Sequence, residues 1–237
     1  MTYISRAAKI LSSRVSADVV ILGPTVIGEG TIVEPMVVIG HPVRAKLMKA
    51  LGSDLGIDEY MDSISSGSQI GSNCIIRSGT VIYEDVVLGD NVETGHNVLI
   101  REGTRIGSGT RVGSGVIIDG ETIIGSNVSI QSMVYIPRGT VIEDGVFLGP
   151  NVVITNDKYP PSRRLDGVRI RRGAVIGANS TLIAGIEIGE NAVVAAGSVV
   201  TKDVPPNKVV MGVPARPVYD VDVFIRKRAE YEGSKAP

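Results

Sequence analysis

The sequence has little of what several other kinds of protein need. It holds one cysteine among 237 residues, Cys74, which excludes a disulfide framework and suggests an inert thiol in the core. It has no tryptophan and two phenylalanines, so the core contains few aromatic rings. Its net charge of −1 provides no strong attraction to nucleic acid or to an anionic membrane, and we expect neither as a partner.

Long hydrophobic runs and histidines are also scarce. No run of about 18 apolar residues occurs, so no membrane-spanning segment is expected. The first residues contain no apolar stretch as long as that of a signal peptide, and we expect a cytoplasmic location. The two histidines, His41 and His96, are too few for a zinc site with three histidine ligands, so no metal is expected.

The abundant feature is a repeat of six residues that runs from Ile70 to Ile154 without interruption. The first position of each hexad is a large aliphatic residue everywhere except at Thr94. The fourth position is a residue type that tolerates positive φ, apart from Glu121 and Met133. The fourth-position residues of this type are Asn73, Gly79, Asp85, Asn91, Asn97, Gly103, Gly109, Gly115, Asn127, Gly139, Gly145 and Asn151.

A period of six is neither a helical period nor that of a simple hairpin. It describes a short strand, a sharp bend at Gly or Asn, and another short strand. Three bends close a triangular coil, so that residues eighteen apart in the sequence stack at a separation of about 4.8 Å. We therefore expect an all-β protein, a parallel β-helix of hexapeptide repeats. A mixed β-sandwich is disfavoured, because its turns would not keep a constant spacing of six.

Interruptions of the repeat predict how the chain is divided. The expected parts are an N-terminal cap over 1–18 with a short helix within 3–14, first repeats over 19–40, an excursion over 41–69, the main β-helix over 70–204 with a loop excursion at 155–169, and a C-terminal segment over 205–237 with a helix near 221–231. The first excursion carries a helical run from Ala45 to Leu51, closed by Gly52. It is either a loop packed on the outside or a lid over a groove.

The most specific motif is the C-terminal run GAVIGANSTLIAGIEIGENAVVAAGSVVTKDVPPNKVVMGVPARPV. It resembles the end of the hexapeptide-repeat acyltransferases that use acetyl-CoA, and the resemblance covers residues 70–217. This resemblance implies a left-handed coil and acetyl-CoA as cosubstrate. It also implies that small residues form a smooth groove for the pantetheine arm, at Gly177, Ala178, Ala195 and Ala196. The family pattern puts Lys202 and Arg216 near the CoA phosphates, where long cations suit phosphate oxygens.

A second motif is FLGPNVVITNDKYPPSRR, over residues 147–164. Many acetyltransferases of this fold have a histidine in the loop after GPNV, but none follows here. The sequence resembles the subgroup that acetylates amino groups of nucleotide-linked sugars, which implies that Asn156 orients the amine. An amide carbonyl can accept a hydrogen bond from an amine, although it is no base at neutral pH. Asp157, Lys158 and Tyr159 are then candidates for substrate binding. The alternative for Asn156 is a loop-shaping Asx-turn.

The third motif, ETGHNVLIREGTRIG, contains His96 at the third position of its hexad, where the side chain leaves the core. We expect His96 on the same edge as the 155–169 loop, three coils from Pro150, or roughly 14 Å along the axis. His96 then binds the distal part of the acceptor, acts as the base in place of Asn156, or is an ordinary surface histidine. Arg101 and Glu102 face outward and contact a pyrophosphate, a ribose or only water.

These features lead to one functional prediction and two alternatives. We expect an acetyl-CoA-dependent N-acetyltransferase that acts on an amino sugar, nucleotide-linked as a precursor of cell-surface glycans. The departing thiolate, with a pKa near 8.5, could itself take the proton. The alternatives are O-acetylation of a sugar hydroxyl and a scaffold without catalysis. The resemblance further implies a homotrimer with the CoA groove between neighbouring subunits.

Overall fold

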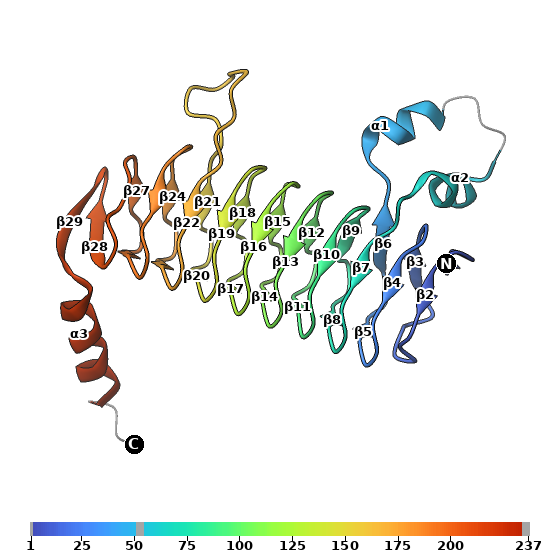
Figure 1. Cartoon of the computed structure of the whole chain (residues 1–237), viewed down its shortest axis with the longest axis horizontal. Helices are drawn as coiled ribbons and strands as arrows, with labels where there is room; N and C mark the ends of the chain where they lie inside the picture. Colours follow the sequence, from blue (N-terminus) through green and yellow to red (C-terminus); the bar gives the residue numbers. More distant parts are fainter. Residues whose placement is uncertain (1, 51–54, 234–237) are drawn as a thin grey trace.

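A computed structural model describes residues 2–50 and 55–233 of the chain. The chain winds into a long solenoid with three parallel sheets along its sides, and two excursions project from it (Figure 1). Sheet A contains β1 (Tyr3–Ile4), β3 (Val19–Ile21), β6 (Val37–His41), β9 (Val81–Tyr83), β12 (Leu99–Ile100), β15 (Ile117–Ile118), β18 (Tyr135–Ile136), β21 (Val153–Ile154), β24 (Thr181–Leu182) and β27 (Val199–Val200).

Sheets B and C follow sheet A in every coil. Sheet B contains β2 (Lys9–Ile10), β4 (Val26–Ile27), β7 (Gln69–Ile70), β10 (Val87–Leu88), β13 (Arg105–Ile106), β16 (Ile123–Ile124), β19 (Val141–Ile142), β22 (Arg169–Ile170) and β25 (Glu187–Ile188). Sheet C contains β5 (Ile32–Val33), β8 (Ile75–Ile76), β11 (Glu93–Thr94), β14 (Arg111–Val112), β17 (Ser129–Ile130), β20 (Phe147–Leu148), β23 (Val175–Ile176), β26 (Val193–Val194), β28 (Lys208–Gly212) and β29 (Ala215–Asp220). The result is the parallel β-helix that the hexads predict, with the left hand that the family resemblance implies.

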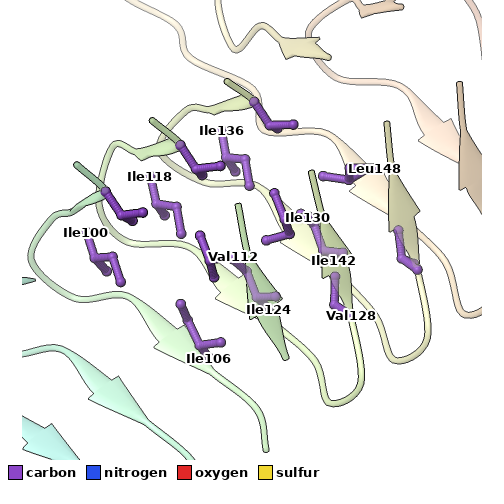
Figure 2. Close-up of a cluster of buried hydrophobic side chains, with 14 of the residues drawn as sticks. Ile100, Ile106, Val112, Ile118, Ile124, Val128, Ile130, Ile136, Ile142 and Leu148 are labelled. Carbon is purple, nitrogen blue, oxygen red and sulfur yellow. The ribbon is translucent and has the colours of Figure 1, made fainter. Parts of the chain in front are cut away.

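The stacking register explains the core. Ile100 pairs with Ile118, eighteen residues later, and both side chains are fully buried. Figure 2 shows the second residue of the strands from β12 to β20 pointing inward, so that the three sheets fill the interior with aliphatic side chains. Because each buried aliphatic side chain contributes roughly 1.5–3 kcal/mol, the repeated inward position holds the coils together.

The bends adopt the backbone conformation that the fourth position predicts. Gly115 has a φ of 68° and Asn97 a φ of 55°. The two exceptions in the pattern, Glu121 and Met133, also have positive φ, at 40° and 63°. The stacked coils therefore impose the bend even on side chains that favour it little.

The predicted N-terminal helix is wrong. Residues 3–14 contain the strands β1 and β2 instead, and Val15 forms a bridge with Val33. Ile4 pairs with Ile21 and Ile10 pairs with Ile27, so the repeat begins earlier than expected. Ile4 and Ile10 are six residues apart, and tertiary pairing with the next coil overrides a local pattern that also fits a short helix.

Both excursions leave at the corner where sheet A passes to sheet B, which we call the A–B corner (Figure 1). The first joins β6 to β7 and contains α1 (Arg44–Leu47), the 3-10 turn η1 (Met48–Ala50) and α2 (Ile57–Ile64). The predicted helix end at Leu51 and Gly52 lies outside the described residues, and α2 was not predicted. The second excursion, residues 155–168, joins β21 to β22.

The C-terminal segment contains the helix expected there. β28 pairs in parallel with β26, and β29 returns antiparallel beside β28. Helix α3 (Val221–Gly233) then extends from the end of the solenoid (Figure 1). Within residues 2–50 and 55–233, none of the helices has the length and apolarity to span a bilayer.

Candidate active site

The corner where sheet C passes to sheet A, the C–A corner, carries a column of mostly small residues. In chain order the column is Ser78, His96, Ser114, Ser132, Pro150, Ala178 and Ala196. The backbone N–H groups of Ala178 and Ala196 have no hydrogen-bond partner among the described residues, whereas the Ala178 carbonyl accepts from Gly197 N at 2.8 Å. A Cβ on Gly177 would lie 2.4 Å from Ala196 N, so only glycine keeps this surface bare.

A hollow at the C-terminal end of the solenoid brings Lys202 and Arg216 together. Its volume is about 260 Å3, and core side chains such as Val200 form part of its wall. Neither cation forms an ion pair in the described part of the chain. Asp203 lines the same hollow and accepts a hydrogen bond from Glu187 N at 2.8 Å, and Arg216 Nη1 donates to Ala215 O at 2.9 Å. Two unpaired cations beside one hollow form a suitable site for phosphate oxygens.

The 155–168 loop is fastened to the solenoid at its neck. Thr155 Oγ1 accepts from Ala184 N at 2.9 Å, and the Asn156 carbonyl accepts from Asp166 N at 2.8 Å. The Asn156 side chain donates from Nδ2 to Arg138 O at 3.2 Å. Asn156 Oδ1 has no hydrogen-bond partner among the described residues, so the side chain is held by its nitrogen and can still accept with its oxygen.

Beyond the neck, the loop is shaped by Asp157. Its carboxylate accepts hydrogen bonds from Ser162 N and Ser162 Oγ, both at 2.8 Å, and from Tyr159 N at 3.1 Å. The bonds from Ser162 lower the pKa of Asp157. Lys158 and Tyr159 are exposed and line a hollow of about 440 Å3 between the loop and Gly185. Asp157 thus supports the loop, while Lys158 and Tyr159 are available to a ligand.

His96 and Asn156 do not share an edge, so that expectation was wrong. His96 is on the C–A corner, whereas Asn156 is on the A–B corner above Arg138, with sheet A between the two corners. The expectation failed because Pro150, which stacks with His96, is separated from the loop by strand β21. His96 Nδ1 lies 4.0 Å from Glu34 Oε2, and its side chain is 55% exposed.

Arg101 and Glu102 lie on the A–B corner and are already paired. The Arg101 guanidinium contacts Glu102 at 2.8 Å and Asp119 at 2.7 Å, and it lies 5.6 Å from the centre of the Tyr83 ring. These contacts tie three successive coils together. Substrate binding by Arg101 and Glu102 stays a prediction that requires these ion pairs to open.

Sequence reasoning missed a polar groove of about 340 Å3 beside the C–A corner. It lies over the outer face of sheet C and is lined by Arg77, Glu93, Arg111 and Gln131, among others. The first residue of each strand in sheet C points outward, and this position could have revealed the groove. Three polar residues, Glu93, Arg111 and Ser129, stack at it in succession between the apolar Ile75 and Phe147. The described residues contain no cluster of three or more His, Cys, Asp or Glu side chains able to hold a metal ion.

Two family models match the solenoid. Residues 85–120 and 121–156 match the bacterial transferase hexapeptide (six repeats), and residues 167–202 match the hexapeptide repeat of succinyl-transferase. Both matches follow the stacked coils, with the second excursion between them. The repeat units that form the candidate groove are therefore hexapeptide units by sequence as well as by geometry.

Individual relatives resemble parts of the chain. A 2,3,4,5-tetrahydropyridine-2,6-dicarboxylate N-acetyltransferase of Clostridium perfringens is 40% identical over 83 residues, which is 35% of this chain and 34% of the relative. The bifunctional protein GlmU of Rubrobacter xylanophilus is 45% identical over 69 residues, 27% of this chain and 15% of the relative. The chain thus spans about a third or less of the length of these curated relatives.

One solved structure extends the likeness to nearly the whole chain. LpxA, a UDP-N-acetylglucosamine acyltransferase from Bacteroides fragilis, matches with a TM-score of 0.51 and 18% identity, over 96% of this chain and 76% of that one. At that identity the likeness concerns the fold alone. The family models and the shared fold agree with the six-residue register: residues 85–156 and 167–202 are hexapeptide repeats, and the chain has the left-handed β-helix fold.

Proposed function

We propose that the protein is an acetyl-CoA-dependent N-acetyltransferase whose acceptor is a nucleotide-linked amino sugar. The observation that carries the proposal is the bare C–A corner at Ala178 and Ala196, together with a hollow at the same end of the solenoid that is lined by the unpaired cations Lys202 and Arg216. The open N–H groups can bind the amide carbonyls of a pantetheine arm, and the two cations suit the phosphates of CoA. The match of residues 85–120 and 121–156 to the bacterial transferase hexapeptide supports the same class of donor.

Asn156 is the proposed positioning group for the acceptor amine. Its Oδ1 is free to accept a hydrogen bond, while its Nδ2 is held by Arg138 O at 3.2 Å. A carbonyl fixed in this way can direct the nitrogen lone pair at the thioester carbon. The C–N bond forms as the C–S bond breaks, and the departing thiolate can take the proton from the nitrogen. The carbonyl oxygen would be stabilised by backbone N–H groups of the corner.

A homotrimer would bring the separated parts of the site together. Because Asn156 and the C–A column flank opposite edges of sheet A, three copies with sheet A facing a common axis would put the A–B corner of one copy beside the C–A corner of the next. The outer face of sheet A is suited to burial, since Ile117 and Val153 are 40% and 39% exposed in the single chain. The loop of one copy would then cover the groove of its neighbour.

A thiol-release assay with acetyl-CoA and a panel of nucleotide amino sugars tests the proposal. We expect release of one thiol per acetylated amine, and no release with the matching sugars that carry a hydroxyl in place of the amine. Transfer to the hydroxyl compounds alone would make the protein an O-acetyltransferase. A scaffold would give no heat on titration with acetyl-CoA. If His96 rather than Asn156 acts in proton transfer, His96→Asn should lower kcat and remove the acidic limb of the pH–rate profile.

A further inference from the structure

The polar groove on sheet C lies along the same corner as the proposed donor site. Its volume is about 340 Å3, and its lining includes the corner residues Gly95, Gly113 and Ser132. Cβ atoms on Gly95 and Gly113 would lie 2.4 Å from Ser114 N and 2.5 Å from Ser132 N, so the floor is bare backbone. Ser132 precedes Pro150 and Ala178 in the C–A column, so the groove lies on the N-terminal side of the proposed pantetheine site along the same corner.

The charges in this groove are not satisfied by one another. Arg111 is exposed, and its guanidinium has no hydrogen bond or ion pair among the residues that the structure describes, although its backbone N–H donates to Val128 O at 2.9 Å. Glu93 is its partner in the strand register, yet the two side chains form no ion pair within 4.0 Å. The Arg77 guanidinium has a single long hydrogen bond, from Nη1 to Thr94 O at 3.5 Å. In contrast, the guanidinium of Arg101 contacts two carboxylates.

We propose that Arg77 and Arg111 bind the diphosphate of the nucleotide-linked acceptor in this groove, an inference that rests on the proposed function. Guanidinium groups form paired, charge-assisted hydrogen bonds with phosphate oxygens. Glu93 and Gln131 line the same groove and can bind sugar hydroxyls. From Gln131 to Arg77 the groove crosses three coils, or roughly 14 Å, which accommodates an extended acceptor. His96 borders it, because its backbone N–H donates to Ser114 Oγ at 3.1 Å.

Calorimetric titration of the full-length protein with UDP, uridine and inorganic phosphate tests this assignment. We expect UDP to bind, and both uridine and inorganic phosphate to bind much more weakly. Arg77→Ala and Arg111→Ala should each weaken UDP binding by roughly ten- to a hundredfold, as the loss of a charge-assisted hydrogen bond implies. Arg169→Ala is the matched control, because Arg169 is also an exposed strand residue but lies on sheet B. It should leave UDP binding unchanged.

The outcomes separate this inference from the proposed function. UDP binding that is unaffected in both groove variants, or weakened equally in Arg169→Ala, would overturn the assignment of the groove. If uridine binds as tightly as UDP, the groove does not bind the diphosphate. If inorganic phosphate binds as tightly as UDP, the groove does not recognise the nucleotide. If the protein binds acetyl-CoA but not UDP, only the assignment of the groove is contradicted. If it binds neither acetyl-CoA nor UDP, the proposed function is contradicted as well.

Discussion

The two excursions leave the solenoid at the same corner but are attached to it in different ways. The first, residues 42–68, is tied down by Glu84, which is 3% exposed and accepts from Val43 N at 3.0 Å, Ser66 N at 2.6 Å and Lys46 Nζ at 2.6 Å. The second, residues 155–168, is bonded to the coils at its neck, and the carboxylates of both its acidic residues, Asp157 and Asp166, bond within the loop.

This difference indicates that the first excursion is a structural cover, whereas the second presents a surface to a ligand or a neighbour. The first excursion also contacts the first coils, because Asp62 accepts from Gly23 N at 2.7 Å and from Tyr3 Oη at 3.1 Å. It therefore covers the N-terminal part of the solenoid, which favours an outer packed segment over a lid. The second projects away from the coils (Figure 1) and exposes 78% of Tyr159, as a loop that closes on another molecule would.

The largest expected effect is the loss of catalytic rate when the second excursion is changed. Asn156→Ala should lower kcat by roughly a hundredfold or more, because an orienting hydrogen bond to the reacting amine is lost. The affinity for acetyl-CoA should stay the same. Glu59→Ala, an exposed change on the first excursion, is the control and should leave kcat unchanged. A normal kcat for Asn156→Ala in the thiol-release assay would contradict the role assigned to the second loop.

A smaller effect is expected on stability, and here the first excursion should be sensitive to substitution and the second should not. Glu84→Gln should lower the free energy of unfolding by about 2 kcal/mol, because a buried carboxylate loses charge-assisted bonds from Lys46 and two backbone N–H groups. Asp157→Asn is the matched change in the second loop and should leave that free energy unchanged. Urea denaturation followed by circular dichroism measures both. Equal losses in the two variants would remove the distinction between the excursions.

The smallest effect concerns acid. Burial raises the pKa of Glu84, but bonds from Lys46, Val43 N and Ser66 N outweigh it and hold the pKa below the ordinary value of 4.5. A lowered folded pKa stabilises the protein above that value, and this stabilisation is lost as the pH falls below it. The melting temperature should therefore decrease between neutral pH and pH values below about 4.5 more steeply for the wild type than for Glu84→Gln. Other carboxyl groups titrate in both proteins, so parallel curves would show that Glu84 contributes nothing.

The fold was predictable because the hexads specify it locally. An aliphatic residue such as Ile118 at the first position and a bend former such as Gly115 at the fourth define each strand and turn. The N-terminal strands were missed, since Ile4, Ala7, Ala8 and Leu11 lie at helical spacing, while Ile4 and Ile10 keep the spacing of six. Helix α2 was missed because it is held by long-range contacts of Asp62 that local sequence does not encode.

The candidate site was only partly predictable. Lys202 and Arg216 were identified by motif, and the structure brings both to one hollow. To assign a residue to a corner, the strands between it and the reference residue must be counted. Strand β21 separates Pro150 from the loop, and because it was not counted, His96 and Asn156 were assigned to one edge. Whether an arginine is free depends on side-chain geometry, since Arg101 finds two carboxylates while Arg111 finds none among the described residues.

The most direct test of the account is hydrogen–deuterium exchange of the full-length protein with and without acetyl-CoA. Exchange reports local opening of backbone hydrogen bonds and ligand cover over free N–H groups. We predict protection of peptides that contain Ala178, Ala196 and the 155–168 loop, and no change over 42–68. Unchanged exchange at the loop and the corner, or protection confined to the first excursion, would contradict the assignment of the donor site and of the two excursions.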